Sequence, residues 1–368
     1  MSDLELLYTD VEDDLRASVR ALLDDRCDAA SVAALYDGDR TIVAGLWKAL
    51  AVDLGLAGLL VPEESGGAGA SAREAGVVLE ELGRYAAPVP FLTSAVVATV
   101  VLAETGGPLL ADLASGAKTA ALAVPLSAAP HDPVPATARV EPDAHLHGTV
   151  SSVAGALEAD VLLVPVRTGD AIAVYAVPAA DVTRTPVVSL DMTRQLADLR
   201  LDGAAAELVL ADGEPAIRRA LLAGAGLLAS EQAGLAQWCL STTISYLKER
   251  RQFGRVVGGF QALKHRLADL FTDVESASAA ARNAAASLAA DTPDADLATA
   301  VAQSYNADLA VRAAEEAVQL HGGIGMTWEH PAHLYLKRAK ADQIAFGSPG
   351  SHRAHLAELA DLPAPGTP

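Results

Sequence analysis

The sequence is poor in cysteine, in aromatic residues and in cations, and each shortage excludes a class of protein. Its 368 residues include two cysteines, Cys27 and Cys239, which lie far apart and form no Cys-x-x-Cys pair. This usage excludes a disulfide scaffold and a thiolate metal site, and it fits a reducing cytoplasm. The longest apolar stretches, such as residues 220–229, fall short of the ~20 residues that span a bilayer, and the acidic N-terminal stretch does not resemble a secretory signal. We therefore expect a cytoplasmic protein that does not insert into a membrane.

The balance of charge is strongly acidic. Asp and Glu number 47 against 27 Lys and Arg, so the formal net charge is −20. Binding to nucleic acid or anionic lipid depends on clustered cations, so we expect neither as a partner, and any phosphate-bearing ligand requires a local group of basic residues. Aromatic residues make up 4% of the chain and apolar residues 51%. A core built mostly from alanine, leucine and valine suits closely packed helices.

Three zones of patterning divide the chain. Residues 1–118 have the apolar period of helices, including an expected helix over residues 72–83 that ends at Gly83 in the usual capping position. Residues 119–212 contain short β-branched or alternating runs with the spacing of an antiparallel barrel or sandwich, and we predict a β-barrel domain. Residues 213–362 return to helical periodicity and predict a four-helix bundle, with helices over residues 221–251, 261–288, 297–321 and 331–345. We expect residues 363–368 to form a flexible tail.

A group of cations is unusual in this acidic chain. Lys248, Arg250, Arg251 and Arg255 lie within eight residues at the end of the longest expected helix, with Gly254 among them. A guanidinium at a helix end can bind a phosphate through two hydrogen bonds, while a following glycine lets backbone amides approach it. The alternative is a solvated helix terminus, where cations interact favourably with the helix dipole.

A Gly-rich turn follows a later expected helix, where Gln319 is succeeded by Gly322 and Gly323. This turn is compatible with ligand binding or with simple capping of the helix. Two histidine pairs have the spacing of metal ligands but lack a convincing third ligand, so we expect no metal site. They are His330 with His333 and His352 with His355.

Taken in order, these segments resemble the acyl-CoA dehydrogenase family. The motifs that carry the resemblance are Arg250-x-Gln-Phe-Gly-Arg, Phe260-Gln-Ala, Leu267-Ala-Asp and Gln319-x-His-Gly-Gly-x-Gly. The resemblance implies a helical N-terminal domain, a middle β-barrel and a C-terminal four-helix bundle. It also implies FAD as the cofactor, an acyl-CoA substrate that is oxidised to a 2-enoyl-CoA, and a flavin electron acceptor. Family members form homo- or hetero-oligomers in which a neighbouring subunit holds the adenosine-diphosphate half of each FAD.

The resemblance assigns cofactor-binding roles to six residues. Arg250 matches the family's pyrophosphate-binding arginine, and Gln252 and Phe253 match positions that flank the same phosphates. Three more match the residues that hold the adenosine side. They are Gln319, Gly322 and Gly323.

The positions of the family's catalytic base do not hold a carboxylate. The usual glutamate corresponds to Phe346, and the position used by some relatives corresponds to about Gly224. The nearest acid on the same expected helix is Glu231, in an Ala/Leu/Gly-rich run. Glu231 is either a displaced general base with a raised pKa or a carboxylate paired with a neighbouring helix or subunit. The backbone N–H of Phe346 could still bind the thioester carbonyl oxygen.

A second departure lies in the middle domain. Family members carry an acid- and glycine-containing segment that contacts the flavin ring and the CoA moiety, but residues 121–130 lack both features here. Two functions remain open. The first is an FAD-dependent acyl-CoA dehydrogenase subunit that uses Glu231 as its base. The second is a non-catalytic partner that supplies Arg250 and Gln319 to the flavin site of another, base-bearing chain.

Overall fold

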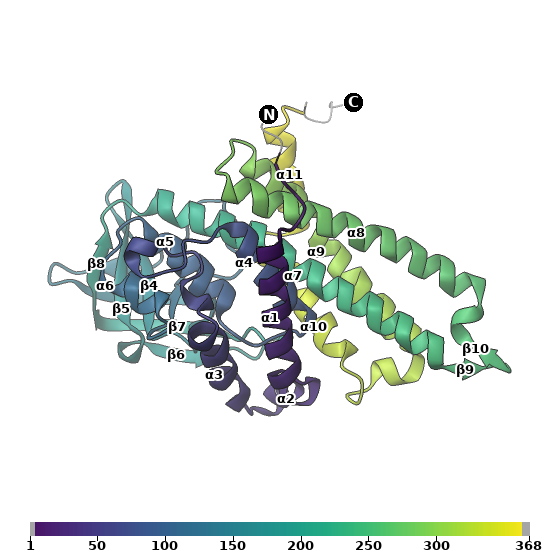
Figure 1. The fold of residues 1–368 in the computed structure, drawn as a ribbon. Coiled ribbons are helices and arrows are strands. Elements are labelled where there is room, and N and C mark those ends of the chain that lie inside the picture. The colour runs from purple at the N-terminus through teal and green to yellow at the C-terminus, as the bar shows by residue number, and fades with distance from the viewer. Residues whose placement is uncertain (1–3, 363–368) are drawn as a thin grey trace, which may run out of the picture.

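The computed structural model describes residues 4–362, so the tail predicted for residues 363–368 lies outside the described residues. A helical N-terminal part lies beside a β-sheet region, and the long C-terminal helices extend away from both (Figure 1). Within residues 4–362, no helix is long and apolar enough to cross a membrane. The N-terminal helices are α1 (Asp10–Arg26), α2 (Ala29–Ala33), α3 (Thr41–Lys48), α4 (Ala72–Arg84), α5 (Thr99–Ala103) and α6 (Pro108–Ala114).

Capping side chains explain where two of these helices begin. Thr9 precedes α1 and exchanges hydrogen bonds with Glu12, and Ser71 precedes α4 and does the same with Glu74. Each pair satisfies backbone N–H groups that have no partner inside the helix. Helix α4 confirms the helix expected over residues 72–83.

The middle region forms two four-stranded sheets, with strand orders β1-β4-β5-β8 and β2-β3-β7-β6. All strand pairs within them are antiparallel except β1 with β4, which is parallel. The described strands do not close into the predicted barrel, because the edge strands of the two sheets, β1 and β8 in one and β2 and β6 in the other, form no ladder with each other. The strands are β1 (Ala120–Leu122), β2 (Arg139–Val140), β3 (His145–Ala154), β4 (Val161–Thr168), β5 (Ala171–Pro178), β6 (Thr183–Pro186), β7 (Leu196–Ala205) and β8 (Glu207–Leu210).

The C-terminal part is built on three long helices that pack against one another, with two shorter helices against the third. They are α7 (Glu214–Glu249), α8 (Gln261–Ala289), α9 (Ala295–His321), α10 (Ala332–Asp342) and α11 (Pro349–Leu359). The four expected helices are confirmed with shifted ends, and α11 is a helix that the sequence pattern did not predict. The interior is rich in alanine, including Ala229, Ala284 and Ala302, which lets the helices approach closely.

The prediction that Gly83 caps a helix is wrong. Gly83 lies inside α4, and a Cβ there would lie 2.2 Å from the carbonyl oxygen of Glu231 on α7. Gly234 of α7 is its counterpart, because a Cβ there would lie 1.9 Å from the carbonyl oxygen of Glu80 on α4. The two glycines therefore let the backbones of α4 and α7 come into contact. This crossing holds α7 against the N-terminal part at the level of Glu231.

Candidate functional site

A pocket lies at the end of the long helices, where the end of α7, the start of α8 and the end of α9 meet. It has a volume of about 570 Å³, and we call it the bundle-end pocket. Five of the six residues assigned to cofactor binding line it. They are Arg250, Gln252, Gln319, Gly322 and Gly323. The two motifs are about seventy residues apart in the sequence, and the antiparallel course of the helices brings them together.

The local fold explains why Phe253 lies outside this pocket. Helix α7 ends at Glu249, and Arg250 adopts an extended conformation that begins a small hairpin of β9 (Arg251–Gln252) and β10 (Arg255–Val256). The two residues of its turn, Phe253 and Gly254, have positive φ angles of 52° and 74°, as a tight two-residue hairpin turn requires. Phe253 is therefore at the tip, 88% exposed, with its ring edge-on to Phe260.

The bundle-end pocket offers positive charge and accessible backbone. Among the described residues, no carboxylate forms an ion pair with Arg250. Gly322 has a φ of 65°, in the region that favours glycine, and a Cβ on Gly322 or Gly323 would meet no atom within 4 Å. His321 also lines the pocket; its Nδ1–H donates to the carbonyl oxygen of Ala317, and burial lowers its pKa, so the ring is neutral.

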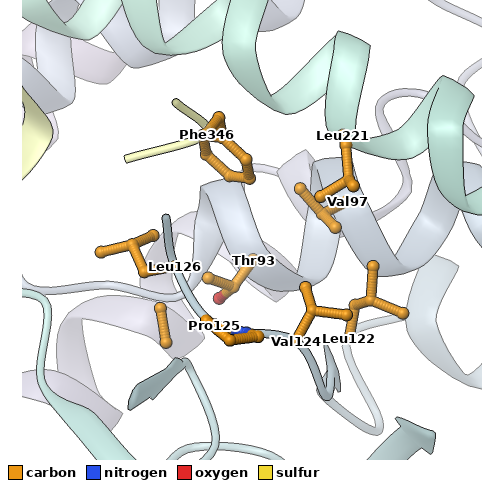
Figure 2. A pocket seen from close by; sticks show the side chains of 9 residues that line it. Thr93, Val97, Leu122, Val124, Pro125, Leu126, Leu221 and Phe346 are labelled. Atoms are coloured by element: carbon orange, nitrogen blue, oxygen red, sulfur yellow. The ribbon is translucent and has the colours of Figure 1, made fainter. Parts of the chain in front are cut away.

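The region where the family places its base is filled by side chains. Figure 2 shows the ring of Phe346 facing Leu126, Val97 and Leu221. A Cβ on Gly224 would lie 2.9 Å from Cζ of Phe346, so the two positions to which the resemblance assigns the base are in contact. The remaining apolar cavity has a volume of about 20 Å³, room for roughly one water molecule and not for an acyl chain.

The backbone of Phe346 is also engaged. Its N–H donates to the carbonyl oxygen of Leu126 at 2.8 Å, and its carbonyl oxygen accepts a hydrogen bond from Nε2 of His352 at 3.0 Å. The expectation that this N–H is free for a thioester carbonyl is therefore wrong. Leu126 belongs to the altered 121–130 segment, so the loss of that segment's acid and glycines coincides with closure of the cavity.

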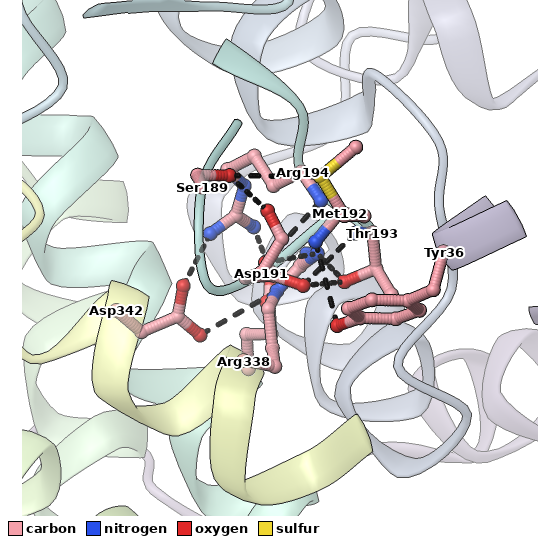
Figure 3. A network of polar contacts seen from close by, with 9 residues as sticks. Tyr36, Ser189, Asp191, Met192, Thr193, Arg194, Arg338 and Asp342 are labelled. Atoms are coloured by element: carbon pink, nitrogen blue, oxygen red, sulfur yellow. Dashed lines mark hydrogen bonds and ion pairs between the residues drawn. The ribbon is translucent and has the colours of Figure 1, made fainter. Parts of the chain in front are cut away.

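Glu231 belongs to a buried ion cluster that joins all three parts of the chain. Figure 3 shows other members of this cluster, among them Arg194, Arg338 and Asp342. Its two carboxylate oxygens accept hydrogen bonds from Arg194 at 2.6 Å and from Arg338 at 2.7 Å. Arg194 also binds Asp342 at 2.5 Å, and Arg338 binds Thr193, which in turn binds Asp191. Arg194 comes from the loop before β7, Arg338 and Asp342 from α10, and Tyr36 of the N-terminal part accepts from the N–H of Met192 at the edge of the cluster.

The electrostatics of Glu231 favour the second of its two alternatives. Burial on its own raises the pKa of this carboxyl, but the charges of Arg194 and Arg338 outweigh it and hold the pKa well below the usual value. A general base needs a pKa near the working pH and access to substrate. Glu231 is 1% exposed and both of its oxygens are bound by guanidinium groups. The structure therefore supports a paired carboxylate.

The cluster contains three carboxyl groups, Asp191, Glu231 and Asp342, against two guanidinium groups. All five cannot be ionised without leaving a buried net negative charge, which is costly. Burial, reinforced by the negative charge of Glu231, raises the pKa of Asp342, and one of its oxygens has no hydrogen-bond partner. Burial and the charge of Glu231 therefore favour the protonated form of Asp342 over that of the other carboxyl groups.

The histidine pairs have other partners than metals. His330 lies against His321 with ring centres 4.0 Å apart, and His355 stacks on His131 at 4.4 Å while bound to Asp296. Within the part of the chain that the structure describes, no group of His, Cys, Asp and Glu side chains has the arrangement of a metal site.

Comparison with known families now identifies the class of protein. Residues 9–108 match the model of the acyl-CoA dehydrogenase N-terminal domain, and residues 211–360 match that of the acyl-CoA dehydrogenase C-terminal domain. The chain therefore belongs to the acyl-CoA dehydrogenase family, whose members are oxidoreductases acting on CH–CH bonds.

Particular relatives cover nearly the whole chain. It is 34% identical over 335 residues to acyl-CoA dehydrogenase IpdE2 of Mycolicibacterium smegmatis, an alignment that covers 91% of this chain and 94% of the relative. Among solved structures it is similar to the ChsE4-ChsE5 complex from Mycobacterium tuberculosis, with a TM-score of 0.86, 28% identity and coverage of 98% and 100% of the two chains. It is also similar to the Tcur3481-Tcur3483 steroid ACAD, with a TM-score of 0.83, 28% identity and coverage of 95% and 98%.

Proposed function

We propose that this chain is a non-catalytic subunit of a hetero-oligomeric, FAD-dependent acyl-CoA dehydrogenase and that it binds the nucleotide half of the cofactor. Its bundle-end pocket holds the adenosine-diphosphate half of an FAD whose flavin ring lies in the active site of a second, base-bearing subunit. The observation that carries this proposal is the contrast between two sites in one chain. The bundle-end pocket is open, and its Arg250 has no carboxylate partner among the described residues. The site for the acyl chain and the base is filled by side chains.

The residues of the bundle-end pocket fit the nucleotide half of the cofactor. Arg250 presents a guanidinium without a carboxylate partner, and guanidinium groups bind phosphates through paired hydrogen bonds. Gln252 and Gln319 add neutral donors and acceptors, and the open backbone at Gly322 and Gly323 leaves room for close approach. A volume of about 570 Å³ is within the range of small-molecule sites.

The site for the acyl chain and the base does not fit. The cavity beside Phe346, of about 20 Å³, does not accept an acyl chain, and its lining is apolar apart from Thr93. No carboxylate stands at Phe346 or Gly224, and Glu231 is bound by two arginines. In this proposal Glu231 is a structural anchor between domains, and abstraction of the α-proton is carried out by the partner.

The division of labour follows from these contacts. When bound, FAD accepts the hydride from the acyl thioester, which is chemistry that no side chain can supply. This chain contributes binding and orientation: Arg250 neutralises the diphosphate, and the Gly322–Gly323 turn positions the adenosine. The similar solved structures support a hetero-oligomer, because ChsE4-ChsE5 and Tcur3481-Tcur3483 each have two different components. The cytoplasmic location expected from the two free cysteines stays a prediction.

The test is cofactor retention in the assembled complex. The full chain is co-expressed with a base-bearing acyl-CoA dehydrogenase subunit, and FAD per chain is measured in the purified complex. Arg250→Gln should lower the affinity for FAD by about ten- to a hundredfold, since it removes charged hydrogen bonds to a phosphate. Arg255→Gln is the matched control, because it removes the same charge from the same hairpin but its guanidinium lies 3.8 Å from the centre of the Phe260 ring, outside the pocket.

A second measurement separates the two functions left open by the sequence. The chain purified alone should bind the adenosine-diphosphate half of FAD but retain less than one FAD per polypeptide through purification, and it should not oxidise acyl-CoA with an artificial electron acceptor. An isolated chain with one FAD per polypeptide and full activity would refute the proposal.

A further inference from the structure

A second arginine faces the bundle-end pocket. Arg266, in the second turn of α8, lines it together with Arg250. Its guanidinium is bound by Glu316 of α9 through two hydrogen bonds, from Nε at 2.9 Å and from Nη2 at 2.7 Å. Arginine has five N–H donors, so Nη1 and one hydrogen of Nη2 remain free. The charge of Arg266 is thus already balanced, and the charge of Arg250 is not.

The pair formed by Arg266 and Glu316 is weak enough to exchange. The two side chains are 44% and 27% exposed, and exposed ion pairs contribute little to stability because water screens them. A diphosphate carries more negative charge than a single carboxylate and offers more acceptor oxygens to a guanidinium. Two guanidinium groups also match the two negative charges of a dinucleotide's diphosphate better than one does.

A second ion pair between the same helices provides a comparison. Arg312 of α9 binds Asp273 of α8 at 2.6 Å, and these side chains are 54% and 29% exposed. This pair resembles the first in exposure and in the helices it joins, and it is made by one hydrogen bond instead of two. Its arginine does not line the bundle-end pocket, since Asp273 lies about 10 Å further along α8 than Arg266.

We propose that Arg266 is a second diphosphate ligand of the bundle-end pocket and that Glu316 is its competing counter-ion. Glu316 lowers the affinity of the pocket for diphosphates by holding the guanidinium and by repelling the incoming phosphate. This inference deepens the proposed function and depends on it, because it concerns the same nucleotide. It adds a residue that the family motifs around Arg250 and Gln319 do not include.

The experiment is a titration of the full chain with ADP at physiological ionic strength, followed by calorimetry, with adenosine as the probe that lacks phosphates. Arg266→Gln should weaken ADP binding by about tenfold. Glu316→Gln should tighten it by about two- to fivefold, because the competing charge is gone. Asp273→Asn is the matched control and should leave ADP affinity unchanged, although it also removes one carboxylate and one ion pair between α8 and α9. Adenosine binding should not respond to Glu316→Gln.

The sign of the change in ADP affinity caused by Glu316→Gln decides between two roles of Glu316. It either competes with phosphate for Arg266 or only stabilises the packing of α8 against α9. If Glu316 only stabilises the packing of the helices, Glu316→Gln and Asp273→Asn should lower thermal stability alike and neither should tighten ADP binding. This result would overturn the inference. Arg250→Gln keeps the two proposals distinguishable. If Arg250→Gln binds ADP like the wild type, the proposed function itself fails. If Arg250→Gln weakens ADP binding but Arg266→Gln does not, only the role of Arg266 as a second ligand is refuted. A wild-type chain that does not bind ADP contradicts both.

Discussion

The ring of Phe346 lies against Gly224, so that a Cβ on Gly224 would come within 2.9 Å of its Cζ and 3.0 Å of its Cε1. Phe346 precedes α11 and Gly224 lies on α7, and these are the two positions at which the resemblance to the family predicts a carboxylate. Their contact explains why neither position can be considered alone. The glycine makes room for the ring, and the ring fills the space in which a base and an acyl chain would meet.

This contact predicts the effect of a methyl group on Gly224. Glycine to alanine inside a helix normally stabilises by about 1 kcal/mol, but overpacking a filled core costs about 1–3 kcal/mol. We expect Gly224→Ala to be less stable to urea than Gly45→Ala, a control on α3 where a Cβ would meet no atom within 4 Å. The difference should shrink in a Phe346→Leu background, which lacks the clashing ring atoms. Equal effects at the two glycines would contradict the contact.

The crossing of α4 and α7 predicts a larger loss. In Gly234→Ala the new Cβ would lie 1.9 Å from the carbonyl oxygen of Glu80, a backbone atom that cannot rotate away. The two helices must separate, and we expect a loss of unfolding free energy of about 3 kcal/mol. Chemical denaturation measures it, and stability at or above that of wild type would show that the helices do not pack this closely.

The raised pKa of Asp342 predicts how the free energy of unfolding depends on pH. Its folded pKa is raised to about 8, whereas an unfolded aspartate titrates near 3.9. Between these values the folded chain binds a proton that the unfolded chain does not, so this group lowers stability as the pH rises through the window. Asp342→Asn imitates the protonated form, and its stability relative to wild type should increase from pH 5 to pH 9. Asp112→Asn, which removes an exposed ion pair with Lys118, is the control. Its difference in unfolding free energy from wild type should not rise from pH 5 to pH 9 as that of Asp342→Asn does.

The role of Glu231 is tested by separating stability from rate. Glu231→Gln weakens the hydrogen bonds from Arg194 and Arg338, and we expect it to lower unfolding free energy by about 1–3 kcal/mol. It should also reduce the pH effect of Asp342, since the negative charge of Glu231 helps to raise that pKa. The turnover rate of the assembled complex, per bound FAD, should stay within about twofold of wild type. A fall of orders of magnitude with normal stability would identify Glu231 as a base.

Features coded by neighbouring residues were predictable from the sequence. Helical periodicity predicts α4 and α7–α10. The resemblance assigns the motifs around Arg250 and Gln319 to one nucleotide, and both motifs line the bundle-end pocket. The role of Gly83 is not predictable in this way. A glycine near a helix end has the same sequence pattern whether it caps the helix or lets a neighbouring backbone approach.

Features that depend on distant segments were not predictable. The ion cluster joins Arg194, Glu231 and Arg338, which come from three segments without a common local pattern. Sequence reasoning recognised Glu231 as an acid in an apolar run but could not name its partners. Closure of a β-barrel likewise depends on hydrogen bonding between the edge strands of the sheets. The local sequence of the short strands β1 and β2 does not indicate whether they pair in this way.

The packing of Phe346 on Gly224 has an evolutionary consequence. A glutamate introduced at residue 224 collides with the ring, and one introduced at residue 346 leaves an apolar void around a charge that has lost its filler. Each single substitution therefore disturbs the packing of its neighbour. A carboxylate at either position is expected to need a compensating substitution at the other, which makes its restoration a two-residue change.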